Sequence, residues 1–213
     1  MTNQLLNYIC LTNLRLKHYF KFFRHPNKKA LNLQLKRTLV KKDTQNVGII
    51  NLIDKLTQYK KFNKNQRVLF VGCRNDFELN YFKKLHQAKI TGIDLYSESS
   101  QIKIMDMHQL EFENNTFDLV FASHVLEHAY NPQQAVNEWL RVAKHQAYFV
   151  IEVPVNYPTN EIDKIDFKTI PNLKKLFKKV KMKIIWSRQL KNGDNDNFHE
   201  TDIISIIFQI DKK

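Results

Sequence analysis

The chain has 213 residues, of which 43% are hydrophobic and 26% charged, and its net charge is +13 at pH 7. This length suits one α/β domain with an extension and is too short for two large domains. No stretch approaches the roughly 18 to 20 apolar residues of a membrane-spanning helix. The two cysteines, Cys10 and Cys73, are too few for a disulfide framework or a zinc site of paired cysteines. We therefore expect a cytoplasmic protein without a metal site.

The positive charge lies in the two ends of the chain. Residues 1–64 hold fourteen Lys and Arg against two Asp and Glu, whereas residues 65–160 hold eight against eleven. A basic segment beside a near-neutral core is typical of proteins that meet an anionic partner, such as RNA or a membrane surface. Compositional bias is the alternative, because Lys outnumbers Arg by 27 to 7 and Asn is abundant. Both interpretations stay open.

Apolar residues at helical spacing predict helices over residues 4–23, within 24–43, and over 47–62. The first is amphipathic, with basic residues between its apolar positions. Such a helix covers apolar surface of its own domain, lies on a membrane or binds RNA, and we favour the first of these. We treat residues 1–64 as a basic helical extension and residues 65–213 as the main domain.

From Arg67 onward, short β-rich runs alternate with helical patterns. This alternation predicts a parallel, doubly wound sheet with right-handed connections and a ligand crevice at the carboxyl ends of the strands. The expected strands are 67–72, 89–94, 102–108, 117–123 and 147–154, and the expected helices are 76–86, opened by Asp76, and 131–144, with Asn131 as its N-cap and Pro132 in its first turn.

After residue 154 we expect a basic helix over 170–180 and an antiparallel pair of strands, 181–190 and 201–210. Gly193 would lie in the long hairpin loop between these strands. The predicted fold is therefore α/β: a doubly wound, mostly parallel, seven-stranded Rossmann-like sheet. It carries an antiparallel C-terminal strand pair and an N-terminal helical extension.

Two residues suggest a nucleoside-type ligand. Gly72 allows the backbone to approach a ligand where the first strand ends, and the following helix presents free N–H groups there. Asp94, twenty-two residues later at the end of the second strand, suits a carboxylate that accepts two ribose hydroxyls. A dinucleotide-binding dehydrogenase would account for these two residues equally well.

The ordered motifs "VLFVGCRNDFEL", "ITGIDL", "IMDMHQL" and "NTFDLVFASHVLEHAYNP" decide between these classes. Together with "EWLRVAK" and "YFVIEVP", they resemble the class I methyltransferases that use S-adenosylmethionine, specifically the small, type 11-like methyltransferase-domain group. The resemblance covers about residues 65–155. It implies S-adenosyl-L-methionine as cofactor, bound by Gly72, Cys73, Arg74, Asp94, Leu95, Asp106, Met107 and Ser123.

Within that pattern each residue has an implied place. Asp106 would accept the adenine amino group, Leu95 and Met107 would flank the base, and Ser123 would lie under the methionine end. His124 would face the methyl acceptor, and it is our candidate general base because imidazole titrates near neutral pH. The alternative for this histidine is a hydrogen bond to loop backbone.

The first turn departs from the family pattern. The family usually reads acid-x-Gly-x-Gly-x-Gly, and here these positions are Phe70, Gly72, Arg74 and Asp76. Arg74 either contacts the cofactor carboxylate, partly replacing backbone donors, or points outward from a wider turn. Two further pairs are interpreted without a catalytic role. Glu127 and His128 are read as turn structure, and His199 and Glu200 as solvent-exposed, with a cap over the acceptor pocket as the alternative for the second pair.

We therefore expect a methyltransferase. The family's amine-methylating members usually carry an Asn/Asp-Pro-Pro-aromatic turn where this chain reads "SHVL", so an oxygen, carbon or small-molecule acceptor is favoured. The alternative is a non-catalytic binding subunit with the same fold and a degenerate cofactor turn. Retention of both Asp94 and Asp106 favours the enzyme. The acceptor is chosen by loops and the N-terminal cap, so the motifs assign neither it nor an oligomeric state.

Overall fold

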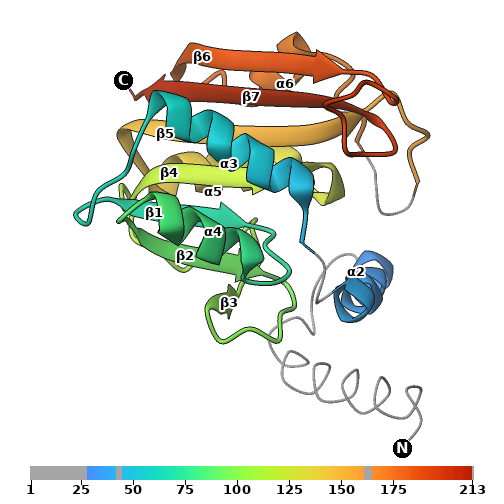
Figure 1. The fold of residues 1–213 in the computed structure, drawn as a ribbon, viewed down its shortest axis with the longest axis horizontal. Coiled ribbons are helices and arrows are strands. Elements are labelled where there is room, and N and C mark those ends of the chain that lie inside the picture. Colours follow the sequence, from blue (N-terminus) through green and yellow to red (C-terminus); the bar gives the residue numbers. More distant parts are fainter. Residues whose placement is uncertain (1–27, 42–44, 161–164, 213) are drawn as a thin grey trace, which may run out of the picture.

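The computed structural model describes residues 28–41, 45–160 and 165–212. The expected amphipathic helix over residues 4–23 lies outside this range. Within it, two helices precede a domain of alternating strands and helices (Figure 1). The elements are α2 (Lys28–Lys41), α3 (Val47–Tyr59), β1 (Arg67–Val71), α4 (Phe77–Leu85), β2 (Lys89–Asp94), β3 (Ile102–Ile104), β4 (Phe117–Ser123), the 3-10 helix η1 (Leu126–His128), α5 (Pro132–Val142), β5 (Ala143–Val155), α6 (Ile170–Lys175), β6 (Lys181–Leu190) and β7 (Asp202–Asp211).

The strands form one seven-stranded sheet in the order β3-β2-β1-β4-β5-β7-β6. Strands β1 to β5 are parallel to one another, whereas β7 runs antiparallel to both β5 and β6. The predicted fold class is confirmed, including the antiparallel C-terminal pair. Because β7 inserts between β5 and β6, the last strand of the chain is an inner strand of the sheet.

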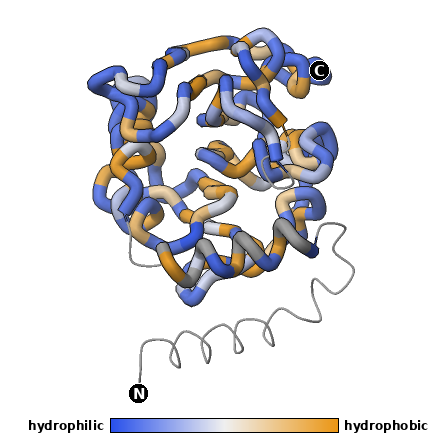
Figure 2. The backbone as a smooth tube through the Cα atoms, turned by 90° about the vertical axis from the view of Figure 1, so that its right-hand side faces the viewer, coloured by the Kyte–Doolittle hydropathy of each residue, from blue (hydrophilic) through white to orange (hydrophobic). Residues whose placement is uncertain are grey.

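Both faces of this sheet are covered by helices, which explains the continuous apolar runs of its inner strands. Residues of α3 and α4 pack with one face in one hydrophobic cluster, and residues of α5 and α6 pack with the other face in a second cluster. Figure 1 shows α3 and α4 in front of the sheet, and Figure 2 shows the hydrophobic backbone segments gathered towards the interior. The strand ends are thus held by a core on two sides.

Helix α3, which the sequence analysis assigned to the N-terminal extension, is part of this core. Its Leu52, Ile53 and Leu56 are fully buried against β1, β4, β5 and β7. Asn46 caps the helix by accepting a hydrogen bond from the main chain of Ile49 at 3.3 Å. The division of the chain at residue 64 stays a prediction, but α3 shares one hydrophobic cluster with α4 and the sheet.

Local structure follows the sequence at one helix start and departs from it at another. Asn131 caps α5, with Pro132 in the first turn, as expected. Asp76 does not cap α4: its Oδ2 instead accepts hydrogen bonds from Ser99 Oγ at 2.9 Å and Gln101 Nε2 at 3.0 Å. Tertiary partners thus replaced the local cap.

Helix α2 packs at the carboxyl end of β2. Its Leu31 and Leu35 are buried in a small cluster with Tyr96, against which Leu95 and Ile104 also pack. The basic segment therefore covers the edge of the sheet where the sequence predicts a ligand. None of the helices in the described ranges is long and apolar enough to cross a lipid bilayer.

Candidate active site

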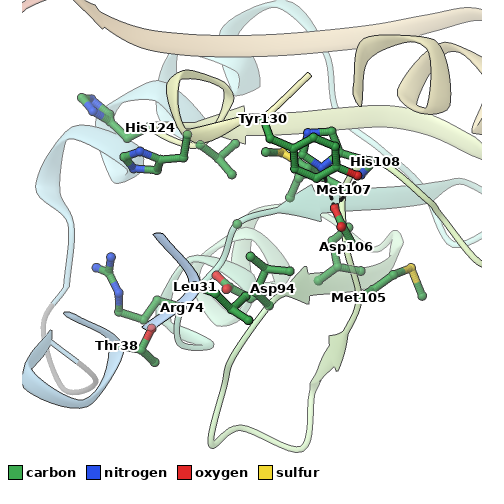
Figure 3. Close-up of a pocket in the computed structure, with 16 residues that line it drawn as sticks. Leu31, Thr38, Arg74, Asp94, Met105, Asp106, Met107, His108, His124 and Tyr130 are labelled. Atoms are coloured by element: carbon green, nitrogen blue, oxygen red, sulfur yellow. Dashed lines mark hydrogen bonds and ion pairs between the residues drawn. The ribbon is translucent and has the colours of Figure 1, made fainter. Parts of the chain in front are cut away.

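A pocket lies at the carboxyl ends of β1, β2 and β4, and α2 closes one side of it (Figure 3). Its wall combines apolar side chains with a few carboxylates, imidazoles and one guanidinium, which is typical of a small-molecule site. The lining residues are Leu31 and Thr38 from α2, then Val71, Gly72, Arg74, Ile93, Asp94, Leu95, Met105, Asp106, Met107, His108, His124, Val125, His128 and Tyr130. We call this the inner pocket.

Six of the sequence-predicted residues for the cofactor line the inner pocket: Gly72, Arg74, Asp94, Leu95, Asp106 and Met107. Gly72 has φ +78°, and a Cβ at this position would lie 2.6 Å from Cγ2 of Val125. Its main-chain N–H donates to the carbonyl of Ile93 at 2.9 Å. Glycine is therefore required here twice, for its backbone conformation and for the approach of Val125.

Asp94 ends β2 with its carboxylate at the pocket wall. Its Oδ1 accepts a hydrogen bond from the main chain of Tyr96 at 3.2 Å. Burial raises the pKa of Asp94 to about 6, although the Tyr96 N–H and the Arg74 guanidinium act in the opposite direction. A carboxylate held in a poorly solvated place gains from a ligand that donates hydrogen bonds to it.

Asp106 is oriented by the histidine two residues later. Its Oδ1 accepts from the main-chain N–H of His108 at 2.9 Å and lies 2.6 Å from His108 Nδ1. His108 Nε2 accepts from the main chain of Asn131 at 3.4 Å, and its ring stacks on Tyr130 with 3.6 Å between centroids. Sequence reasoning missed His108 and Tyr130, although an Asp-x-His spacing is itself a signal for this contact.

Arg74 lines the wall of the pocket and does not point away from it. Within the described part of the chain, its Nε is buried without a hydrogen-bond partner. A guanidinium nitrogen in this state is an available donor for an anionic group of a ligand. The side chain of Arg74 therefore lies at the pocket, and its contact with a ligand carboxylate stays a prediction.

Cys73 and Ser123 depart from their predicted places. The thiol of Cys73 is buried against the sheet, 3.5 Å from the carbonyl of Ile93, and burial raises its pKa well above the ordinary value. Only the main chain of Cys73 is therefore placed to meet a ligand. Ser123 lines the neighbouring cavity and donates its hydroxyl to Oε1 of Glu152 at 3.1 Å.

This neighbouring cavity, the outer cavity, has a volume of about 790 Å³. It shares Gly72, Arg74, His124 and His128 with the inner pocket. Its other walls come from the start of α3, the end of β5 and the β6–β7 loop. They are Gln45, Asn46, Val47, Ile49, Asn75, Glu78, Ser123, Glu127, Pro154, Tyr157, Phe198, His199, Glu200 and Thr201.

His199 and Glu200 both line this cavity, as the alternative interpretation had it, and Glu200 is exposed as expected whereas His199 is not. The side chain of His199 is only 13% exposed. Its ring lies against that of His124, with 4.0 Å between centroids. The sequence gives no local signal for this contact, because the loop after β6 is brought back only by the pairing of β7 with β5.

His124 stands where the two cavities meet. Its backbone has φ +52°, an uncommon conformation for a residue with a side chain, and its N–H donates to the main-chain carbonyl of Glu152 at 2.9 Å. Burial lowers the pKa of His124 to about 4. The imidazole is therefore neutral near pH 7 and presents a lone pair.

Glu152 lies on β5 between Ser123 of β4 and Ser205 of β7 in the sheet register. Its side chain is buried, and its Oε2 accepts from Ser205 Oγ at 2.6 Å. Burial acts to raise the pKa of Glu152, but His199, His124 and Ser205 together hold it below the ordinary value. A buried carboxylate is thus kept ionised next to two imidazoles.

The architecture is that of the class I methyltransferase fold. Residues 69–151 match a family model described as a methyltransferase domain. The resemblance drawn from the motifs is confirmed over these residues, which match the type 11 methyltransferase-domain model.

Solved structures share the fold at low sequence identity. An S-adenosylmethionine-dependent methyltransferase from Aquifex aeolicus superposes with a TM-score of 0.58 at 15% identity, covering 82% of this chain and 97% of that one. One from Methanosarcina mazei gives a TM-score of 0.55 at 16% identity, covering 75% and 98%. The [4+2]-cyclase SpnF gives 0.59 at 14% identity, covering 77% and 81%. Since a cyclase is among them, the fold alone does not establish methyl transfer.

Proposed function

We propose that this protein is an S-adenosylmethionine-dependent methyltransferase, with the cofactor in the inner pocket and the methyl acceptor in the outer cavity. One observation carries this proposal. Asp94 and Asp106 follow neighbouring strands and line one apolar-walled pocket, and that pocket joins a larger cavity at His124. A nucleoside ligand and a second substrate would meet at this junction.

The residues of the inner pocket fit the cofactor chemically. The partly desolvated carboxylate of Asp94 would accept the ribose hydroxyls, and Asp106 would accept the adenine amino group. Leu95 and Met107 supply apolar surface for the base. The unpartnered Nε of Arg74 would donate to the cofactor carboxylate, in place of the missing glycines of the first turn.

When bound, the cofactor supplies a methyl group on a positively charged sulfonium. The protein then has two tasks, to align the acceptor and to exclude water. Val71, Ile93 and Val125 form an apolar part of the wall of the inner pocket. His124 faces the acceptor with a neutral imidazole, which accepts a hydrogen bond from a hydroxyl and does not repel the sulfonium charge.

We further propose an oxygen, carbon or small-molecule acceptor. The segment from Ser123 to Leu126 lacks the proline pair of the amine-methylating turn. Among these acceptors, a cavity of about 790 Å³ has the size of a drug-like ligand site.

Calorimetric titration of the full chain with S-adenosylhomocysteine tests the proposal. We expect saturable binding, and we expect Asp94→Ala to weaken it by at least about thirtyfold, which corresponds to about 2 kcal/mol of lost hydrogen bonding to a charged group. Asp211→Ala, at an exposed carboxylate on the far end of β7, is the matched control. If folded wild-type protein gives no heat at millimolar ligand, the protein is instead a non-catalytic member of the fold.

A further inference from the structure

Three metal-ligand side chains converge at the wall of the outer cavity, where two histidines line the cavity and a glutamate is buried next to them. They are His124 after β4, Glu152 on β5 and His199 in the β6–β7 loop. One ligand atom from each lies within 4.8 Å of the other two. His199 Nε2 is 3.5 Å from Glu152 Oε1, and His124 Nε2 is 3.7 Å from the same oxygen.

These separations are close to those of a metal site. Zinc bound to nitrogen and oxygen at 2.0 to 2.2 Å in tetrahedral geometry places its ligand atoms about 3.3 Å apart. The two observed distances exceed this by only a few tenths of an ångström. The two histidine nitrogens lie within 4.8 Å of each other, so binding one ion requires the imidazoles to rotate towards it.

Both imidazoles present a nitrogen that lacks a hydrogen-bond partner. Considering the described residues, the Nε2 atoms of His124 and His199 are buried and make no hydrogen bond, although each faces Glu152. Buried polar atoms in this state are uncommon, and an unfilled ion site is one accepted explanation. Two imidazole nitrogens that face one carboxylate oxygen, each 3.5 to 3.7 Å from it, are an arrangement that a bound cation would stabilise.

The surrounding residues hold these ligands in place. Ser123 and Ser205 donate to the Glu152 carboxylate from the strands on either side. His124 Nδ1 lies 3.8 Å from Oε1 of Glu127, which leaves Nε2 as the nitrogen that faces the cluster. Metal-bound histidines characteristically direct their other nitrogen towards a carboxylate in this way.

A simple ion pair explains less of this arrangement. A protonated His199 beside Glu152 would account for one contact. This ion pair would leave His124 Nε2 buried without a partner. It would also place the charged ring of His199 4.0 Å, centroid to centroid, from the ring of His124. A single divalent ion satisfies both nitrogens and the carboxylate together.

We propose that His124, Glu152 and His199 bind a divalent first-row transition-metal ion through the two Nε2 atoms and Glu152 Oε1. Two imidazoles and one carboxylate suit Zn²⁺ or Fe²⁺, whereas Mg²⁺ and Ca²⁺ prefer oxygen ligands. Three protein ligands leave a coordination position open, as in catalytic metal sites. That position is available to a molecule in the outer cavity.

A consequence for substrate class rests on the proposed function. An ion at this place would bind the oxygen of an acceptor hydroxyl and favour its deprotonated form, the proton passing to solvent water. His124 would then act through the metal and not as the proton acceptor itself. The favoured acceptors narrow to molecules that carry a hydroxyl group next to the transferred methyl.

The test uses the full chain, stripped with a chelator, dialysed and titrated with Zn²⁺. We expect one ion per chain by calorimetry and elemental analysis, and no comparable binding of Mg²⁺. His199→Ala and His124→Asn should each weaken Zn²⁺ binding by more than about tenfold, since even supporting residues of metal sites have effects of 10- to 100-fold. Asparagine suits position 124 because it tolerates positive φ.

The matched control is His145→Ala, at a histidine that is 59% exposed and outside the cluster. It should bind Zn²⁺ like the wild type. Co²⁺ gives a second readout, because its visible absorption bands report low coordination number and should disappear in His199→Ala. Circular dichroism confirms that each variant is folded.

The inference is overturned if wild-type protein binds well below one Zn²⁺ per chain, or if both cluster variants bind it as tightly as His145→Ala. Titration of the stripped protein with S-adenosylhomocysteine separates this failure from failure of the proposed function. Cofactor binding without Zn²⁺ binding would leave the methyltransferase standing and remove the metal site. Zn²⁺ binding without cofactor binding would leave the metal site standing and remove the methyltransferase proposal.

Discussion

The imidazole of His124 and the carboxylate of Glu152 are joined twice, by side chain and by main chain. Nε2 of His124 lies 3.7 Å from Oε1 of Glu152, and the His124 N–H donates to the Glu152 carbonyl at 2.9 Å. The second contact continues the β4–β5 pairing one residue beyond Ser123. The sheet itself therefore places this histidine over a buried carboxylate, at the junction of the two cavities.

Replacing Asp94 with Asn should stabilise the unliganded protein at high pH. Burial raises the folded-state pKa of Asp94 from 3.8 to about 6, so protonation is favoured in the folded state. The associated stability is fully present below pH 3.8 and is lost as pH rises through 6. Asn resembles the protonated form and avoids this loss. We expect Asp94→Asn to raise the unfolding free energy by about 1 to 3 kcal/mol at pH 8.

Urea denaturation at pH 8 and pH 4 measures this effect, with Asp211→Asn as the exposed control. The gain should shrink towards zero at pH 4, where both forms carry no charge at position 94. An equal gain at the two pH values would show that burial of the Asp94 charge is not its cause. Arg74 and His128, which act electrostatically on the Asp94 carboxylate, are present in both the wild type and Asp94→Asn.

Gly72→Ala should destabilise the protein more than Gly193→Ala. Both glycines have positive φ, +78° and +92°, so alanine incurs a backbone cost of about 1 to 2 kcal/mol at either position. A methyl group at position 72 also meets Val125 at 2.6 Å, whereas nothing lies within 4 Å at position 193. We expect an additional overpacking cost of about 1 to 3 kcal/mol at Gly72.

Thermal or urea unfolding of the two variants measures the difference. Adding Val125→Ala to Gly72→Ala should recover part of the additional cost, because it removes the methyl groups that collide. Equal destabilisation by the two alanine variants would mean that the Val125 side chain moves aside without a measurable cost.

Leu35→Ala should weaken cofactor binding without touching the cofactor. Leu35 is fully buried and holds α2 against Tyr96, while Leu31 and Thr38 of the same helix line the inner pocket. Loosening this contact should lower the affinity for S-adenosylhomocysteine by about fivefold to thirtyfold, the range expected for 1 to 2 kcal/mol. Val40→Ala is the control on the same helix, since Val40 is 81% exposed. Unchanged affinity in Leu35→Ala would show that α2 does not contribute to the pocket.

Gly48→Ala should disturb the proposed metal site from the opposite wall. A Cβ at Gly48 would lie 2.6 Å from Nε2 of His199, so the imidazole must leave its present position next to Glu152. Alanine itself is compatible with the first turn of α3. We expect Zn²⁺ affinity to fall by about tenfold, with S-adenosylhomocysteine affinity unchanged. If Gly48→Ala binds Zn²⁺ as tightly as the wild type does, Nε2 of His199 is not a ligand of the ion.

Much of the scaffold was predictable because its signals are local. Periodicity and caps identified the strands, α5 with its Asn131 cap, and the C-terminal pair around Gly193. Asp94 and Asp106 follow neighbouring parallel strands, and the ends of such strands meet at one edge of a sheet. Their presence in one pocket therefore followed from the order of the motifs along the chain.

The contacts that complete the site are decided by tertiary structure. Glu152 reads as one residue of an apolar strand, and only the register with β4 and β7 surrounds it with Ser123 and Ser205. His199 reaches it from a loop 47 residues further on, and α2 closes the pocket from a segment outside the family motifs. Periodicity records which face of an element is buried, but not which distant side chains meet there, because that depends on strand order and register. The sequence by itself thus determined the fold and the carboxylates of the inner pocket, and the folded chain decided the cluster of His124, Glu152 and His199.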